Sequence, residues 1–379
     1  MQLVHRVYTS IAGWQSFSSV RYAICFNSIT PDALKQNRRF SIWRTIKLRG
    51  NHQLNKQQSH KTQQQAVPSD LDSGQLGAET TGTVITNFGA HVDIEGDQAP
   101  FRGTVVRCFK RGNMEHLVSG DRVVWQPAEN NVKNNGVVIA RAPRKSELLR
   151  PDRRGKLRPV AANIDRIGVV FAPRPSPQSN LIDRYLVAAE NHHITPFLVL
   201  NKTDLTTEEN RAAIEQLVET YKFVGYQVIC VSATTGEGVA SLNNYLSQYT
   251  AILVGQSGVG KSSLINRLQP NNHSSVGALS ESSDEGIHTT TASKLVHLDN
   301  GGMLIDSPGI REFGLNHLDS QSILEGFVDF RPYLNRCKFR DCQHHKEPGC
   351  ALLAAVDQGS VLPQRLHSYR QILENEINS

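Results

Sequence analysis

The sequence predicts a multidomain protein in which a small β-barrel precedes a central α/β domain and a short helical domain closes the chain. Five strand-like runs follow one another between residues 83 and 140, and from residue 167 to 305 apolar strands alternate with helical patterns. Three of the six cysteines lie within residues 337–350. The expected boundaries are 1–80 for an N-terminal extension, 81–143 for the barrel, 144–314 for the α/β domain and 315–379 for the helical domain.

The positive charge of the chain is concentrated near its start. Residues 1–75 hold 10 Lys and Arg against 3 Asp and Glu, a net charge of +7, whereas the other residues carry 31 against 32. The basic, Gln- and Asn-rich part of this arm, residues 35–65, has too little apolar surface to fold alone. Such arms bind nucleic acid or an anionic surface, and a solvated tail is the alternative. The sequence contains no run of 18 or more apolar residues, so it predicts no membrane span.

Residues 1–34 fit two interpretations. They are mildly apolar and hold one acidic residue, Asp32, as in a transit peptide, but they lack a clear apolar region followed by a small-residue cleavage site. Sequence added by an upstream start codon fits equally well.

A five-stranded barrel of the OB type is expected next. Its strands are predicted at 83–85, 90–94, 104–108, 122–125 and 137–140, separated by turns such as Ser119-Gly120-Asp121. OB barrels often bind RNA, and the suitable cationic side chains here are Arg102, Arg107, Lys110 and Arg111. The alternative is a small β domain with scattered surface charge.

The α/β domain follows a basic segment, residues 141–158, with 8 basic and 2 acidic residues, which we interpret as a linker. Strands are predicted at 167–171, 196–200, 228–231, 251–254, 294–298 and 303–305, and helices at 181–190, 208–221 and 263–268. This alternation is typical of a doubly wound parallel sheet with helices on both faces. A closing helix is predicted at 364–373.

A complete phosphate loop of the pattern G-x-x-x-x-G-K-S lies between a predicted strand and a predicted helix. The loop and the first residue after it are Gly255, Gln256, Ser257, Gly258, Val259, Gly260, Lys261, Ser262 and Ser263. Its glycines let backbone N–H groups converge on phosphates at the positive end of a helix. We expect Lys261 to reach the β- and γ-phosphates and the Ser262 hydroxyl to ligate Mg²⁺.

A guanine-binding loop is predicted where the strand at 196–200 ends. Asn201, Lys202, Thr203 and Asp204 form an N-K-x-D motif, in which the Asp carboxylate accepts hydrogen bonds from guanine N1–H and its amine. Adenine offers neither donor, so it would leave the carboxylate unpaired. Lys202 should lie along the base and Asn201 should tie this loop to the phosphate loop. Ser232 and Ala233, at the end of the next strand, are expected to support the base, and a helix N-cap at Asp204 is the alternative.

The sequence Asp306-Ser307-Pro308-Gly309 completes the nucleotide site. Asp306 is expected to hold Mg²⁺ through water and the Gly309 N–H to bond the γ-phosphate. A switch segment between them and the phosphate loop offers Thr290, or its neighbour Thr289, for Mg²⁺. Ile310 stands where many GTPases have a water-orienting Gln, so slow intrinsic hydrolysis is expected, and His288 is the candidate to position the water.

The order of these motifs is unusual. Most GTPases run from the phosphate loop through the switch and D-x-x-G to N-K-x-D, whereas here N-K-x-D comes first and D-x-x-G comes last. Relocating the termini of a sheet leaves its site intact. D-x-x-G then leads directly into the C-terminal domain, which should respond mechanically to the bound nucleotide.

The C-terminal domain contains a candidate metal site. Cys337, Cys342, His344 and Cys350 supply three thiolates and an imidazole, the ligand set of a closed structural Zn²⁺ site. Such a site contributes on the order of 10 kcal/mol to folding. His345 could replace His344, and the cysteines would also fit a disulfide or unrelated free thiols. The flanking basic residues suit RNA contact; they are Arg331, Arg336, Lys338, Arg340 and Lys346.

Together these motifs resemble the bacterial ribosome small-subunit-dependent GTPase A family, RsgA or YjeQ. The resemblance runs from about Gly82 to the C-terminus and includes the stretches 119–125 and 310–314. It implies an OB barrel, a circularly permuted GTPase and a zinc domain that bind the 30S subunit late in its maturation, with hydrolysis stimulated by the ribosome. By position it assigns GTP binding to 201–204 and 255–263 and zinc to the four ligands above. Residues 1–34 depart from the family, which puts the start of the chain in doubt.

We therefore expect a GTPase that uses Mg²⁺ and holds one structural Zn²⁺. It should assist assembly of the 30S subunit and bind 16S rRNA. It should act as a monomer in the cytoplasm and should not bind a membrane. A non-catalytic RNA-binding scaffold that holds GTP is a second hypothesis, favoured by Ile310 but opposed by the intact Lys261, Ser262 and Asp306. A GTPase with a membrane or translation-factor role is a third, for which no anchor is visible.

Overall fold

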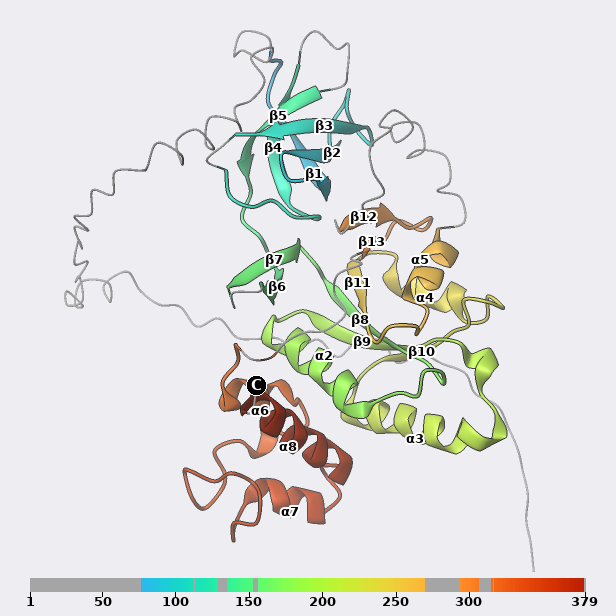
Figure 1. Ribbon diagram of the computed structural model, residues 1–379, viewed down its shortest axis with the longest axis vertical. Helices are drawn as coiled ribbons and strands as arrows, with labels where there is room; N and C mark the ends of the chain where they lie inside the picture. Colours follow the sequence, from blue (N-terminus) through green and yellow to red (C-terminus); the bar gives the residue numbers. More distant parts are fainter. Residues whose placement is uncertain are drawn as a thin grey trace, which may run out of the picture. The chain divides into compact units, whose positions relative to one another are not determined.

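The computed structural model describes residues 76–111, 114–128, 135–152, 156–269, 293–306, 315 and 317–377 (Figure 1). All of them belong to the second of the two units into which the chain divides, residues 55–379. The predictions for the arm at 1–75 and for His288, Thr290 and Gly309 lie outside the described residues. Within the described ranges, no helix combines the length and the apolar character needed to cross a membrane.

The predicted OB-type barrel is confirmed. Its strands are β1 (Thr80–Asn87), β2 (His91–Gly96), β3 (Val105–Lys110), β4 (Arg122–Pro127) and β5 (Asn135–Arg141). They pair in the order β1-β2-β3-β5-β4, with β3 parallel to β5, and β4 pairs with β1 to close the barrel. Trp125 fills the interior and is fully buried, because Gly82 and Gly136 leave room for its ring.

The segment interpreted as a linker is structured at both ends. Arg141 ends β5, and residues further on form the antiparallel hairpin of β6 (Glu147–Pro151) and β7 (Leu157–Ala162). Three of its basic side chains are bound to carboxylates, Arg141 to Glu115, Arg144 to Asp121 and Arg158 to Asp152. The excess of basic residues therefore reflects ion pairs as well as exposed charge.

The α/β domain contributes six strands, in the order β10-β9-β8-β11-β13-β12, to a sheet that continues from β12 into β1 of the barrel. The strands are β8 (Arg166–Phe171), β9 (Thr195–Leu200), β10 (Val228–Cys230), β11 (Thr250–Val254), β12 (Lys294–His297) and β13 (Met303–Asp306). Neighbouring strands are parallel except for β12, which forms an antiparallel hairpin with β13. The short connection between the two strands, residues 298–302, allows this hairpin but not a parallel crossover.

Helices cover both faces of this sheet. Alternate strand residues such as Val169 and Phe171 pack with helices α2 (Ser179–Asn191) and α3 (Glu208–Val224). Their neighbours Val170 and Ala172 pack with α4 (Val239–Leu246) and α5 (Lys261–Leu268). Because side chains alternate along a strand, a continuous apolar run such as β8 has to be buried on both faces.

The C-terminal domain contains α6 (Ser320–Gly326), a 3₁₀ turn at Arg331–Tyr333, α7 (Ala351–Asp357) and α8 (Pro363–Ile377). Its aromatic core stacks Phe327 on Phe330, with ring centroids 4.8 Å apart. Arg365 of α8 is almost fully buried and forms ion pairs with Asp183 of α2 and with Asp329. This buried network joins the C-terminal helix to the α/β domain. Loss of one partner would leave an unpaired buried charge and would destabilise the protein.

Candidate GTP and zinc sites

The phosphate loop connects β11 to α5, as its motif requires. Gly255 and Gly260 have φ angles of 141° and 93°, which L side chains rarely adopt. A Cβ on Gly255 would lie 2.1 Å from the carbonyl oxygen of Val170 on the neighbouring strand. The Lys261 Nζ donates to the carbonyl oxygens of Gly255 and Gln256 at 2.7 and 2.9 Å. The lysine ammonium therefore spans the loop that would hold the phosphates.

Asn201 joins the N-K-x-D loop to the phosphate loop. This fully buried side chain donates from Nδ2 to the carbonyl oxygen of Val259 at 2.8 Å. Its Oδ1 accepts a hydrogen bond from the backbone N–H of Ala233 at 3.1 Å. One amide thus holds three loops together: the one after β9, the one after β10 and the one after β11.

Lys202 and Asp204 also contact the loops that Asn201 joins. The Lys202 Nζ donates to the carbonyl oxygens of Gly258 and Arg174, at 2.5 and 3.2 Å. Asp204 accepts a hydrogen bond from the hydroxyl of Ser232, which in turn accepts one from the Thr235 N–H at 3.1 Å. Thr203 begins a short 3₁₀ turn, and its backbone N–H donates to Val231. The predicted guanine loop and its predicted support at Ser232 and Ala233 are therefore in direct contact.

Asp306 ends β13 beside the phosphate-loop strand. β11 and β13 pair in parallel, with Ile252 opposite Ile305, so their carboxyl ends meet at one edge of the sheet. Burial raises the pKa of the half-buried Asp306 carboxyl, and the charges of Lys294 and Lys261 oppose this rise. Ser262 and Ser263, in the first turn of α5, belong to the same edge. A carboxylate, a hydroxyl and a lysine at this edge can hold a metal-bound triphosphate.

Sequence reasoning missed two contributors to this site. The carbonyl of Arg174 positions Lys202, but a backbone acceptor leaves no signal in side-chain patterns. Lys294 lies opposite Asp306 in the β12–β13 register, and only the pairing of the strands reveals this relationship. A cavity of 820 Å³ lies elsewhere, around Glu190, Thr195 and Arg331 at the start of β9. It is remote from the end of β9, where Asn201 begins the guanine loop.

The four predicted zinc ligands converge in the C-terminal domain. Their ligand atoms all lie within 4.8 Å of one another. The Nδ1 of His344 is 3.6, 3.6 and 3.3 Å from the sulfurs of Cys337, Cys342 and Cys350, and the sulfurs of Cys337 and Cys350 are 3.8 Å apart. Ligands bound tetrahedrally at the usual Zn–S and Zn–N distances stand about 3.5 to 3.8 Å apart. The cluster is therefore compatible with one zinc ion.

The backbone around the cluster contacts two of the sulfurs and places one of the two histidines beside them. Backbone N–H groups of Ala351 and Leu353 donate to the sulfurs of Cys337 and Cys350. His344 is held in a left-handed conformation, with φ 59°, and its carbonyl accepts a hydrogen bond from Arg370. His345 is exposed and does not belong to the cluster. It is therefore His344, and not His345, that lies together with the three cysteines.

The fold and the order of its loops define a circularly permuted P-loop GTPase. The sequence model of the RsgA GTPase family matches residues 141–316. The chain is 50% identical over 341 residues to the small ribosomal subunit biogenesis GTPase RsgA of Ectopseudomonas mendocina, covering 90% of this chain and 97% of that protein. For the protein of the same name from Azotobacter vinelandii the identity is 49%, with the same coverage. This chain belongs to the RsgA family of GTPases, and it is a GTP hydrolase.

Two solved structures share the fold. YjeQ from Thermotoga maritima superimposes with a TM-score of 0.66 and 28% identity, covering 80% of this chain and all of that one. YloQ, described as a circularly permuted GTPase, gives a TM-score of 0.62 and 28% identity over 79% of this chain and 96% of the other. The likeness therefore extends over barrel, GTPase and C-terminal domain together.

Proposed function

We propose that this GTPase is a late maturation factor of the 30S ribosomal subunit, which binds 16S rRNA and hydrolyses GTP faster when the subunit is bound. The observation that carries the proposal is the 50% identity over 97% of a protein named for small ribosomal subunit biogenesis. A factor of this kind would work as a monomer in the cytoplasm, where the subunit assembles.

The contacts of the described residues support the following nucleotide roles. Asp204 would accept the two guanine donors, Lys202 would cover the base, and Asn201 would keep their loop against the phosphate loop. Ser232 and Ala233 would support the base through their hydrogen bonds to Asp204 and Asn201. The loop from Gly255 to Ser263 would bind the phosphates.

Magnesium and the attacking water need further residues. Ser262 and Asp306 would share Mg²⁺, which supplies charge neutralisation for phosphoryl transfer. Gly309, Thr290 and His288 remain proposals from sequence: an N–H for the γ-phosphate, a Mg²⁺ ligand and the group that positions the water. Because Ile310 cannot orient water, a slow basal rate and a large effect of the 30S subunit are expected. In the C-terminal domain, one structural zinc would be bound by the three cysteines and His344.

A basic and aromatic surface on the barrel supports rRNA binding. Phe88 is 42% exposed and stacks on His91, with ring centroids 5.4 Å apart. The guanidinium of Arg107 lies 5.3 Å from the Phe88 ring centroid and is ion-paired with Asp93, and the Lys110 ammonium lies beside Asn87. Exposed rings with adjacent cations stack unpaired bases and neutralise phosphates.

The proposal is tested by sedimentation of the full chain with purified 30S subunits, in GDP and in a non-hydrolysable GTP analogue. We expect binding that is tighter with the analogue. Phe88→Ala should weaken it about tenfold, since stacking on one base contributes roughly 1 to 3 kcal/mol. Phe223→Ala, at a 58% exposed phenylalanine of α3, is the matched control and should bind normally. Absence of 30S binding in both nucleotides would refute the proposal, and equal losses in both variants would refute the barrel surface.

A further inference from the structure

The turn Ser119-Gly120-Asp121 of the barrel lies outside the residues assigned above to nucleotide and RNA binding, yet all three of its carbonyl oxygens are hydrogen-bonded. Its three carbonyl oxygens accept hydrogen bonds from Ala162 N–H, from the Asn163 side chain and from Val84 N–H, at 3.0, 2.7 and 2.8 Å. The donors come from β1 and from the end of the β6–β7 hairpin. The turn is therefore a joint between the barrel and the segment that leads into β8.

The hydroxyl of Ser119 extends this joint to the GTPase sheet. Ser119 is 1% exposed, and its Oγ lies 2.7 Å from the carbonyl oxygen of Ser293 and 3.0 Å from that of Ile85. Ser293 is the residue immediately before β12. A hydroxyl has one proton, so the shorter contact makes Ser293 the favoured acceptor.

Gly120 brings the same turn against β13. Its φ is 90°, and a Cβ at this position would lie 2.1 Å from the carbonyl oxygen of Ala162 and 3.4 Å from Cδ1 of Ile305. Ile305 directly precedes Asp306. The turn thus contacts the residue before β12 and lies beside Ile305 of β13, the residue next to the proposed magnesium carboxylate.

A row of paired residues connects the barrel with this carboxylate. Thr86 of β1 is the register partner of Lys294, and Lys294 is the register partner of Asp306. Residues directly opposite each other on adjacent strands project from the same face. A barrel residue is therefore only two strands away from Asp306, although the two are far apart in sequence.

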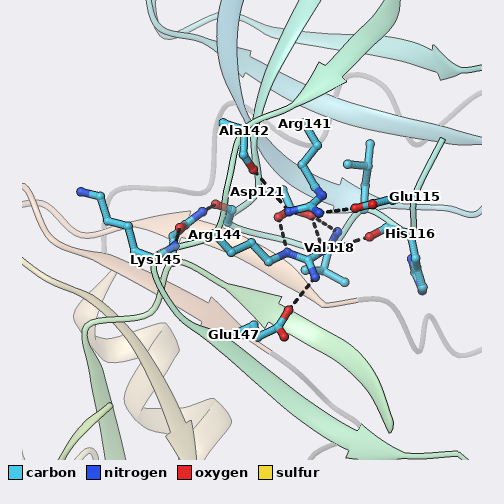
Figure 2. Close-up of polar contacts among 12 residues, drawn as sticks. Glu115, His116, Val118, Asp121, Arg141, Ala142, Arg144, Lys145 and Glu147 are labelled. Atoms are coloured by element: carbon cyan, nitrogen blue, oxygen red, sulfur yellow. Dashed lines mark hydrogen bonds and ion pairs between the residues drawn. The ribbon is translucent and has the colours of Figure 1, made fainter. Parts of the chain in front are cut away.

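A buried ion pair keeps the joint rigid. Arg144 donates from Nε and from a terminal nitrogen to the two carboxylate oxygens of Asp121, at 2.7 and 2.9 Å. The same guanidinium contacts Glu147 and the carbonyl of His116, as Figure 2 shows. Asp121 is fully buried and Arg144 nearly so. Bidentate pairs of this kind fix the relative orientation of the two side chains, because two parallel hydrogen bonds constrain both partners.

We propose that the Ser119-Gly120-Asp121 turn is a positioning element for GTP hydrolysis, and that Ser119 holds the β12–β13 hairpin so that Asp306 keeps its place at the phosphate loop. The barrel would then set the rate of hydrolysis as well as bind RNA. This inference rests on the magnesium role proposed for Asp306, but it does not require the 30S subunit.

The test compares Ser119→Ala with Ser146→Ala in the full chain. Ser146 is a matched control, because its hydroxyl also donates to a backbone carbonyl, at 2.6 Å, but the acceptor is Ile164, which lies before β8. Single-turnover hydrolysis of GTP is measured without ribosomes, and affinity is measured with fluorescent GDP. Ser119→Ala should lower the hydrolysis rate about fivefold, which corresponds to roughly 1 kcal/mol of transition-state stabilisation. Its GDP affinity should stay unchanged, and Ser146→Ala should hydrolyse at the wild-type rate.

Two results would overturn the inference: a wild-type rate for Ser119→Ala, or equal loss of rate in both variants, which would indicate general destabilisation. Asp306→Asn separates the inference from its premise. If that variant hydrolyses GTP normally, the magnesium role of Asp306 is wrong. If it is inactive and Ser119→Ala is fully active, only the positioning role fails.

Discussion

Asn201 and Gly260 approach each other so closely that residue 260 has no room for a side chain. A Cβ there would lie 2.4 Å from Nδ2 of Asn201, the atom that donates to the Val259 carbonyl. The guanine loop and the phosphate loop are thus fitted to each other through one buried amide. Nucleotide affinity should therefore depend on this contact.

Asn201→Ala should therefore weaken GDP binding about 10- to 100-fold. The substitution leaves the Val259 carbonyl and the Ala233 N–H without their partner, and each unsatisfied group costs roughly 1 to 3 kcal/mol. Titration with fluorescent GDP measures the effect. Asn191→Ala is the control, since Asn191 also donates to two carbonyls, those of Val187 and Ser322, but away from the site. Equal affinities of Asn201→Ala and wild type would contradict this role of the amide.

Asp204→Asn should change the preferred base. The carboxylate accepts from two guanine donors, whereas an Asn amide can donate to the additional carbonyl of xanthine. Loss of two charge-assisted hydrogen bonds should lower GDP affinity on the order of 10²- to 10⁴-fold, and xanthosine diphosphate should bind better than GDP. Competition between the two nucleotides measures the preference. If Asp204 served only as a helix cap, the variant would keep its preference for GDP.

The two adjacent histidines should differ in their effect on zinc. His344→Ala removes a member of the cluster and should lower zinc affinity by at least about 100-fold, because even outer contacts of a metal site contribute 10- to 100-fold. His345→Ala should retain one zinc per chain. Metal content of the purified variants, measured by mass spectrometry, checks both. Loss of zinc in His345→Ala alone would show that the ligand assignment is wrong.

The contact between β2 of the barrel and β12 should depend on pH. A hydrogen bond from His297 to Glu95 raises the pKa of this histidine above its usual value of 6.5, and burial opposes the rise. The stabilisation is therefore fully present below about pH 6.5 and is lost as pH increases through the folded-state pKa. Since the His297 side chain is half exposed, the effect should be small.

Thermal unfolding of wild type and His297→Gln measures this contribution. The difference in melting temperature should be largest near pH 6 and should shrink toward pH 9, and Glu95→Gln should show the same trend. A difference that grows with increasing pH would have the wrong sign for a histidine whose pKa is raised.

The sequence predicted contiguous motifs better than it predicted pairings between distant segments. The phosphate loop and the N-K-x-D motif could be interpreted because their residues are neighbours, and the β8 and β9 runs because they are uniformly apolar. The contact of Arg174 with Lys202 uses a backbone carbonyl, which no residue pattern encodes. The bridge between Thr86 and Lys294 joins strands of two domains. His344 and His345 are chemically identical in the sequence, so only backbone geometry distinguishes them.

The basic segment after the barrel shows the limit of composition. Eight cations suggested a linker, but Arg144 binds Asp121, and Leu148 of the same segment is fully buried. Charge counts cannot separate cations that face solvent from cations already paired with carboxylates. The β6–β7 hairpin was missed for this reason.

Ribosome-dependent hydrolysis is best examined through GTP turnover by the full chain with and without 30S subunits, with Lys261→Ala as the inactive reference. This permuted GTPase lacks the water-orienting Gln, so its basal rate of hydrolysis should be slow. If it serves the 30S subunit, binding of the subunit should complete the site and raise the rate about 10³-fold or more. The variant should abolish both rates. Equal turnover with and without subunits would contradict ribosome-dependent hydrolysis and would favour a scaffold that holds GTP for its structure.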